Sequence, residues 1–286
     1  MKPATAAFYQ KPFIKQGWLR ALIFLLFYFV FFLSVSVFIM LLAPDNIKNA
    51  SAGSGSFLFF SVILTAFFSI LLVASFRKFI DRNSFSSLGL KFAASKKDAL
   101  LGFLTGIILL LIATLIMVAS KNLVWIAVDF NAIELLSGIV LMLLVAFYEE
   151  LVFRGYILNN LLQSLNPQKS LLISALLFAL AHFGNPGIGL IGFLNIFLAG
   201  VLLGINYVYT KNLWFAVMLH FSWNFFQGYV LGFQVSGILL KSVLSQQTNC
   251  AAFITGVPFG LEASVISTLL YLLAIGVFYF YYNNKK

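Results

Sequence analysis

The chain has few of the side chains from which soluble active sites are usually built. Among its 286 residues are one cysteine, two histidines and eight acidic residues. The single cysteine, Cys250, excludes an intramolecular disulfide and a metal site made from several cysteines. Charged residues make up 9% of the chain and hydrophobic residues 62%, whereas a soluble domain has roughly 25% and 45–50%. This composition excludes an ordinary soluble domain and indicates a membrane protein.

Apolar runs, in contrast, cover most of the chain. A transmembrane helix needs about 20 mostly apolar residues, and eight runs approach or exceed that length: 19–43, 57–76, 100–120, 135–157, 170–183, 188–209, 213–231 and 261–282. The first run is longer than the roughly 7–15 apolar residues of a secretory signal, so we expect it to remain as a span. The predicted fold is an all-α polytopic membrane helix bundle with about eight transmembrane helices.

The basic residues predict on which side of the membrane the chain ends lie. The net charge is +10, and with a cytoplasmic N-terminus all Lys and Arg residues except Lys48, Lys121 and Lys241 fall in cytoplasmic segments. Under the positive-inside rule both termini are then cytoplasmic, and the expected location is the bacterial inner (cytoplasmic) membrane. The basic surplus therefore reflects topology, so the expected surroundings are the lipid bilayer and no nucleic acid.

Two adjacent carboxylates, Glu149 and Glu150, lie inside the fourth run. The 14 residues from Leu135 to Tyr148 would form a helix of about 21 Å, too short for a hydrocarbon core of about 30 Å. The helix must continue past the carboxylates, which places them within the membrane and nearer its cytoplasmic side. An ionised group there costs roughly 2.5–3.5 kcal/mol or more, so both residues are candidates for function.

A local ion pair explains one of these carboxylates and leaves the other unexplained. Glu150 and Arg154 are four residues apart on one helix face, with the acid on the side that favours pairing. Taken alone, this pair is most simply structural. Glu149 points about 100° away from Glu150 and gains no local cation.

The two histidines fall in other predicted spans. His182 ends the fifth run, and His220 lies in the seventh, with Asn224 one turn later on the same face. Counted along their helices, Glu149 and both histidines lie about 10–18 Å from the cytoplasmic face, so they can converge on one site. A buried Glu is a suitable general base for water, and a His–Asn pair can stabilise an oxyanion. No serine stands in a G-x-S-x-G setting, so these residues favour peptide hydrolysis without a covalent intermediate.

Three short motifs follow one another, each on its own predicted span. They are Glu-Glu-x-x-x-Arg (Glu149, Glu150, Arg154), Phe-x-x-x-His (Phe178, His182) and His-x-x-x-Asn (His220, Asn224). In this order the motifs closely resemble those of the CPBP family, also called Abi, which contains CAAX prenyl proteases and bacteriocin-processing enzymes. The resemblance covers roughly Leu135 to Leu231 and includes the segment NLWFAVMLHFSWN.

The resemblance implies a role for each motif. Glu149 would activate water with help from His182, while Glu150 and Arg154 would shape and neutralise the site. The third motif would form the oxyanion pocket. The family also implies an all-helical membrane fold with a cavity open to the cytoplasm, and a membrane-embedded or lipid-linked peptide or protein as substrate.

Metal dependence has two possible answers under this resemblance. Glu149, His182 and His220 would supply the His₂Glu ligand set of a catalytic zinc. However, the sequence contains no His-Glu-x-x-His helix motif, and the family pattern also supports a metal-free glutamate mechanism. We expect no metal and no cofactor, with zinc as the alternative.

The sequence thus predicts a CPBP-type, glutamate-dependent intramembrane peptidase, with a metallopeptidase as a variant. Two other functions stay open. One is a proton-coupled membrane transporter, because intramembrane Glu and His residues relay protons; the other is a non-catalytic bacteriocin-immunity or scaffold protein. We divide the chain into an N-terminal transmembrane region with three spans, residues 1–130, and a CPBP-like catalytic membrane domain, residues 131–286.

Overall fold

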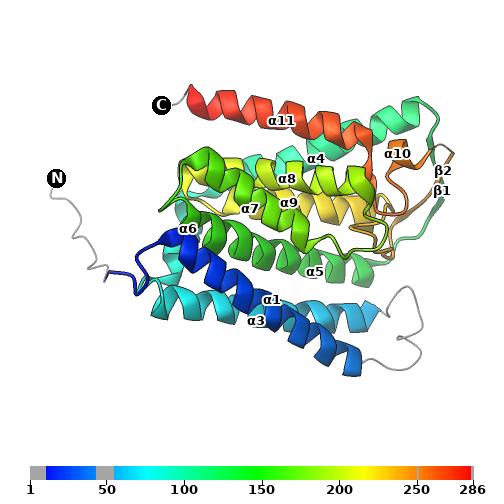
Figure 1. Cartoon of the computed structure of the whole chain (residues 1–286). Helices are drawn as coiled ribbons and strands as arrows, with labels where there is room; N and C mark the ends of the chain where they lie inside the picture. The colour runs from blue at the N-terminus through cyan, green and yellow to red at the C-terminus, as the bar shows by residue number, and fades with distance from the viewer. Residues whose placement is uncertain (1–10, 43–54, 250, 285–286) are drawn as a thin grey trace.

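The computed structural model describes residues 11–42, 55–249 and 251–284 (Figure 1). Cys250 and Lys48 lie outside this range. Each of the eight apolar runs contains a helix. These helices are α1 (Gly17–Leu42), α3 (Gly55–Phe79), α4 (Lys96–Ala119), α5 (Ala132–Glu150), α7 (Pro167–Ala181), α8 (Gly189–Thr210), α9 (Trp214–Phe225) and α11 (Val265–Asn283). The predicted all-α bundle is confirmed.

Two helices that carry motif residues continue as π-helix, and Arg154 lies within the first π-helical segment. α5 passes into the π-helical segment η3 (Leu151–Leu158) and then into α6 (Asn159–Leu161), so residues 132–161 form one long helix. α9 passes into a second π-helical segment, η4 (Phe226–Val230). Six helices of the described residues, counting 132–161 as one, are long and apolar enough to cross a membrane, whereas α7 is shorter.

Short elements close the two ends of the bundle (Figure 1). The termini end is where α1 begins and α11 ends, and it carries η1 (Phe85–Leu88) and η2 (Phe92–Ala94). At the sheet end β1 (Leu123–Val128) pairs antiparallel with β2 (Leu244–Thr248), and α10 (Ala252–Thr255) and η5 (Leu261–Ala263) precede α11. Residues 233–249 and 251–260 therefore contain the strand β2 and the helical turn α10.

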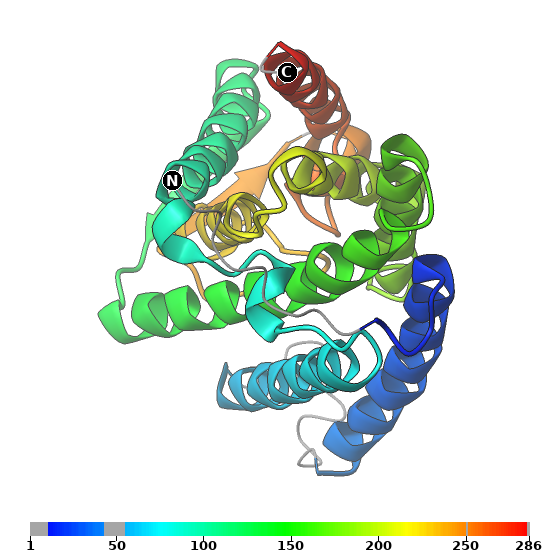
Figure 2. The ribbon, with the colours of Figure 1, turned by 90° about the vertical axis from the view of Figure 1, so that its left-hand side faces the viewer.

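α9 is the central helix of the bundle (Figure 2). It packs against α4, α5 and α8, and nine of its 12 residues are buried, among them His220. α4 approaches it closely because Gly102 faces it: a Cβ at this position would lie 2.1 Å from the carbonyl oxygen of Phe215. His220 is thus held in the interior of the bundle.

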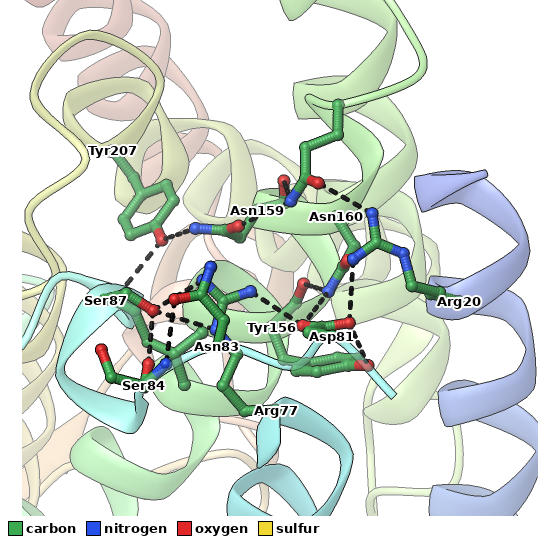
Figure 3. A network of polar contacts seen from close by, with 12 residues as sticks. Arg20, Arg77, Asp81, Asn83, Ser84, Ser87, Tyr156, Asn159, Asn160 and Tyr207 are labelled. Atoms are coloured by element: carbon green, nitrogen blue, oxygen red, sulfur yellow. Dashed lines mark hydrogen bonds and ion pairs between the residues drawn. The ribbon is translucent and has the colours of Figure 1, made fainter. Parts of the chain in front are cut away.

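A buried charged network closes the termini end (Figure 3). Asp81 follows α3, and its carboxylate accepts hydrogen bonds from Arg20 of α1 at 2.9 Å and Arg77 of α3 at 2.8 Å. All three residues are at most 4% exposed. Tyr156 of η3 and Asn160 of α6 donate to the same carboxylate at 3.2 and 3.3 Å. The network therefore attaches the 132–161 helix to α1 and α3.

Replacing Asp81 by Asn would leave two buried guanidinium groups without a counter-charge. Because breaking a buried pair leaves an uncompensated charge, we expect Asp81→Asn to lower the free energy of unfolding by about 3–5 kcal/mol. The matched control is Asp129→Asn on an exposed residue of the sheet end, which should unfold like the wild type. Thermal unfolding of all three proteins in one detergent checks this, and equal midpoints for the two variants would contradict it.

Candidate active site

The carboxylate of Glu150 is the buried centre of the site. Its Oε1 accepts a hydrogen bond from Arg154 Nη1 at 2.8 Å and lies 2.9 Å from Nδ1 of His220. The Glu150 and Arg154 side chains are fully buried. Arg154 also donates to the carbonyl oxygen of Gly200 at 3.0 Å, and its guanidinium lies 4.3 Å from the centre of the Phe178 ring. The expected ion pair is therefore formed, and it also binds a histidine from α9.

Glu149 faces the other way, toward both histidines. Its Oε2 lies 3.7 Å from Nε2 of His182 and 4.0 Å from Nε2 of His220. This oxygen is buried and accepts no hydrogen bond from the described residues, while Oε1 accepts one from Tyr148 at 3.3 Å. Both separations are too long for a direct hydrogen bond, and a water molecule can bridge polar groups at such separations. The geometry around Oε2 therefore suits a water molecule.

Each histidine is oriented by a partner on its Nδ1 atom. Nδ1 of His182 lies 2.8 Å from the carbonyl oxygen of Phe178, one turn earlier in α7. Since a carbonyl oxygen only accepts, Nδ1 carries the proton and Nε2 of the neutral ring is an acceptor. Nδ1 of His220 must likewise donate to the carboxylate of Glu150. Both rings thus turn Nε2 toward Glu149.

Asn224 completes the set of motif residues. Together with His182 and His220 it lines a cavity that also contains Glu149. A second cavity, on the side of α8 and α11, shares Asn224 and both histidines but not Glu149. The structure therefore brings all six polar residues of the motifs into one region.

Two residues that sequence analysis did not place at the site also contribute. Ser236, which has a positive φ of 49°, lines both cavities. Its backbone N–H donates to Oε1 of Glu262 at 2.6 Å, and Gln227 donates to the other oxygen. Glu262 is only 3% exposed. Neither Ser236 nor Glu262 is separated from a motif residue by the spacing of one helix face, so no signal in the sequence points to them.

The position of Glu149 along its helix is consistent with the expected one. Sequence analysis places the carboxylates nearer the end where the termini lie. In the structure 12 residues, 150–161, continue the helix beyond Glu149 toward that end, and 17 residues, 132–148, precede it. His182 caps α7 at the end that faces the sheet.

Glu149, His182 and His220 are also the alternative zinc ligands. A tetrahedral zinc with bonds of about 2.0–2.1 Å holds its ligand atoms about 3.3 Å apart, whereas the two Glu149 distances are 3.7 and 4.0 Å. Within the described residues no group of three or more His, Cys, Asp and Glu side chains is arranged to hold a metal ion. As placed, the three residues do not fit zinc.

The family comparison agrees with the motifs. Residues 131–226 match the family described as Rce1-like, type II CAAX prenyl endopeptidase. This segment extends from the N-cap of α5 to the end of α9 and contains all six polar residues of the motifs. The predicted resemblance is confirmed over these residues. Comparison with curated proteins and with solved structures returned no match.

The central ion pair can be tested by a double-mutant cycle. Arg154→Met leaves the buried Glu150 carboxylate without its cation, so we expect it to lower the free energy of unfolding by about 3–5 kcal/mol. In the double variant Glu150→Gln/Arg154→Met neither charge remains, and most of the stability should return. Thermal unfolding of the wild type, both single variants and the double variant measures the coupling. If the loss of stability in the double variant equals the sum of the losses in the two single variants, the pair is not the stabilising unit.

Proposed function

We propose that the chain is an intramembrane endopeptidase in which Glu149 activates the water that attacks the peptide bond. One observation carries the proposal: Oε2 of Glu149, which has no partner in the described residues, faces Nε2 of His182 and of His220 inside a cavity. The Rce1-like segment supports a peptidase of the CAAX-protease type. A membrane-associated peptide is the corresponding substrate class.

The first step in this proposal is the attack of water. A water about 2.8 Å from both Oε2 of Glu149 and Nε2 of His182 would donate one hydrogen to each acceptor. Its lone pairs then stay free for the carbonyl carbon of the scissile bond. As the new C–O bond forms, Glu149 takes one proton of the water, and the carbonyl oxygen takes the electron pair of the C=O bond.

The second requirement is a set of donors for that oxyanion. Asn224 lines the cavity, and its side-chain amide can donate from Nδ2. His220 can donate from Nε2 when its ring is protonated, a state that the Glu150 carboxylate on Nδ1 stabilises. Such donors contribute about 2.7–4 kcal/mol each in other acyl-transfer enzymes. The proton on Glu149 then moves to the leaving nitrogen, the oxyanion re-forms the C=O bond, and the C–N bond breaks. An amine and a carboxylic acid leave, Glu149 is again ionised, and the acid gives its proton to the amine or to solvent.

Glu149→Gln tests the general base. Gln keeps the shape of the side chain but cannot take a proton, so we expect cleavage to fall about 10²–10⁴-fold while the protein stays folded. The matched control is Glu134→Gln, which removes only a surface ion pair with Lys241 and should leave activity unchanged. The readout is the set of membrane-protein termini, by mass spectrometry, in cells with equal expression of each protein.

The outcomes of this comparison separate the functional classes. Termini that are present with the wild type and Glu134→Gln but lost with Glu149→Gln would identify both proteolysis and the substrate. Unchanged cleavage by Glu149→Gln would reject the general base. Termini that are identical in all three strains would instead favour the transporter or the scaffold.

Metal dependence is tested separately. We expect the purified protein to keep its activity after dialysis against EDTA and 1,10-phenanthroline, because neither water activation nor oxyanion binding in this proposal uses an ion. The metal content before and after dialysis is measured by inductively coupled plasma mass spectrometry. Activity that is lost with the metal and restored by added zinc would favour the zinc alternative.

A further inference from the structure

We infer that Glu262 is a positioning residue of the site: through Ser236 and Gln227 it holds residues 233–240 closed over the cavity that contains Glu149. The inference deepens the proposed function and rests on it. We call residues 233–240 the cover, because they line this cavity at the sheet end of the bundle. The cover, Gln227 and Glu262 all follow the Rce1-like segment, which ends at residue 226.

The cover brings mostly apolar side chains to the cavity. Its lining residues are Val235, Ser236, Ile238 and Leu240. Apolar side chains in this position keep bulk water out, and electrostatic interactions are stronger in a site from which bulk water is excluded. The position of the cover therefore affects how strongly the proposed base and the oxyanion donors act.

The carboxylate of Glu262 is buried, and its hydrogen bonds go to the cover and to η4. Oε1 accepts from the backbone N–H of Ser236 at 2.6 Å and from its hydroxyl at 3.3 Å. Oε2 accepts from Gln227, whose side-chain amide also donates to the carbonyl oxygen of Gln234 at 2.7 Å. None of the ion pairs among the described residues includes Glu262. Because a buried carboxylate without a cation depends on its hydrogen bonds, Glu262 and the cover stabilise each other.

Two glycines allow the cover to pack closely against its neighbours. A Cβ at Gly260 would lie 2.3 Å from the carbonyl oxygen of Gln234. A Cβ at Gly237 would lie 2.2 Å from the carbonyl oxygen of Pro186, in the loop that follows His182. Both glycines have a positive φ, 134° and 84°, which glycine adopts without steric cost. The cover is therefore packed against the loop of a site histidine as well as against the turn before η5.

Glu262 also holds the helix that carries Asn224. Gln227 is fully buried and follows Asn224 by three residues in the helix that runs from α9 into η4. Its hydrogen bond to Glu262 thus fixes the turn directly after a proposed oxyanion donor. Asn224 and Ser236 line the same two cavities. Loss of the Glu262 carboxylate would therefore release the cover and this turn together, without removing any proposed catalytic group.

Amide hydrogen exchange tests the anchor without requiring proteolysis. Glu262→Met removes both acceptor oxygens, whereas Glu262→Gln keeps one acceptor for Ser236 and turns an amide toward the amide of Gln227. In purified protein in detergent, we expect the peptide of residues 233–241 to exchange about 10–100-fold faster in Glu262→Met, because a hydrogen bond to a charged group changes a local opening equilibrium by about that factor. The exchange rate of Glu262→Gln should lie between those of the wild type and Glu262→Met.

The matched control is Asn195→Leu. Asn195 is also fully buried, and beside the start of α11 it donates to the carbonyl oxygen of Ser264 at 2.8 Å and accepts from Thr268 at 2.7 Å. This variant should lower the thermal midpoint but leave the exchange of residues 233–241 as in the wild type. Equal acceleration in Asn195→Leu and Glu262→Met would indicate a general loss of stability and would overturn the anchor. Unchanged exchange in Glu262→Met, or in Glu262→Gln if Glu262→Met does not fold, would also overturn it.

Cleavage then tests whether the anchor positions the site. The readout is again the set of membrane-protein termini, normalised to the amount of folded protein. We expect Glu262→Met to lower cleavage about 10²-fold, the effect of misplacing a reacting group by about 1 Å. Glu262→Gln should restore part of the cleavage, and Asn195→Leu should cleave like the wild type.

The outcomes of the two measurements are distinguishable. Normal cleavage by Glu262→Met despite fast exchange would overturn the positioning role, as would a Glu262→Gln that exchanges slowly but cleaves no better than Glu262→Met. If the wild type releases no termini beyond those of Glu149→Gln while the exchange rates follow the expected order, the anchor of the cover stands and only the proposed peptidase function fails.

Discussion

The arrangement of the bundle interior depends on how one buried carboxylate, that of Glu150, is neutralised. A carboxylate with no water contact is tolerated only when it is paired and hydrogen-bonded. Arg154 supplies the pairing from the next turn, and His220 supplies a second bond from α9. Because Arg154 also binds Gly200 of α8, this one charge connects three helices. The Glu150–Arg154 pair, taken alone, is most simply structural. Through its bond to His220 it also orients a histidine of the site.

The same physical rule operates at the other end of the long helix. Asp81 neutralises Arg20 and Arg77, and it binds η3 and α6. Glu149 thus sits on a helix that is held by one buried charge cluster beside it and another about two to three turns farther on. For the general base proposed here such rigid support matters, since misplacement by about 1 Å can reduce a rate about 10²-fold.

The features that depend on local spacing could be predicted from the sequence. The eight helices follow from apolar length, and the Glu150–Arg154 bond follows from a four-residue separation. The approach of both histidines to Glu149 followed from depth along the helices. The bond between Arg20 and Asp81 could not be predicted, because it joins residues 61 positions apart. Nor could the pairing of β1 with β2 or the two π-helical segments, which depend on tertiary packing.

The adjacency of Glu149 and Glu150 makes sense in terms of total charge. The two side chains point in different directions, so one carboxylate binds the Arg154–His220 pair and the other faces the cavity. With His220 protonated, two carboxylates, one guanidinium and one imidazolium sum to zero, which suits a site of low dielectric. In the proposed mechanism, attack by water would move one negative charge from Glu149 to the oxyanion without changing that sum. The second carboxylate would then allow a protonated histidine to stand beside the oxyanion, and a site with Glu149 alone would lack that donor.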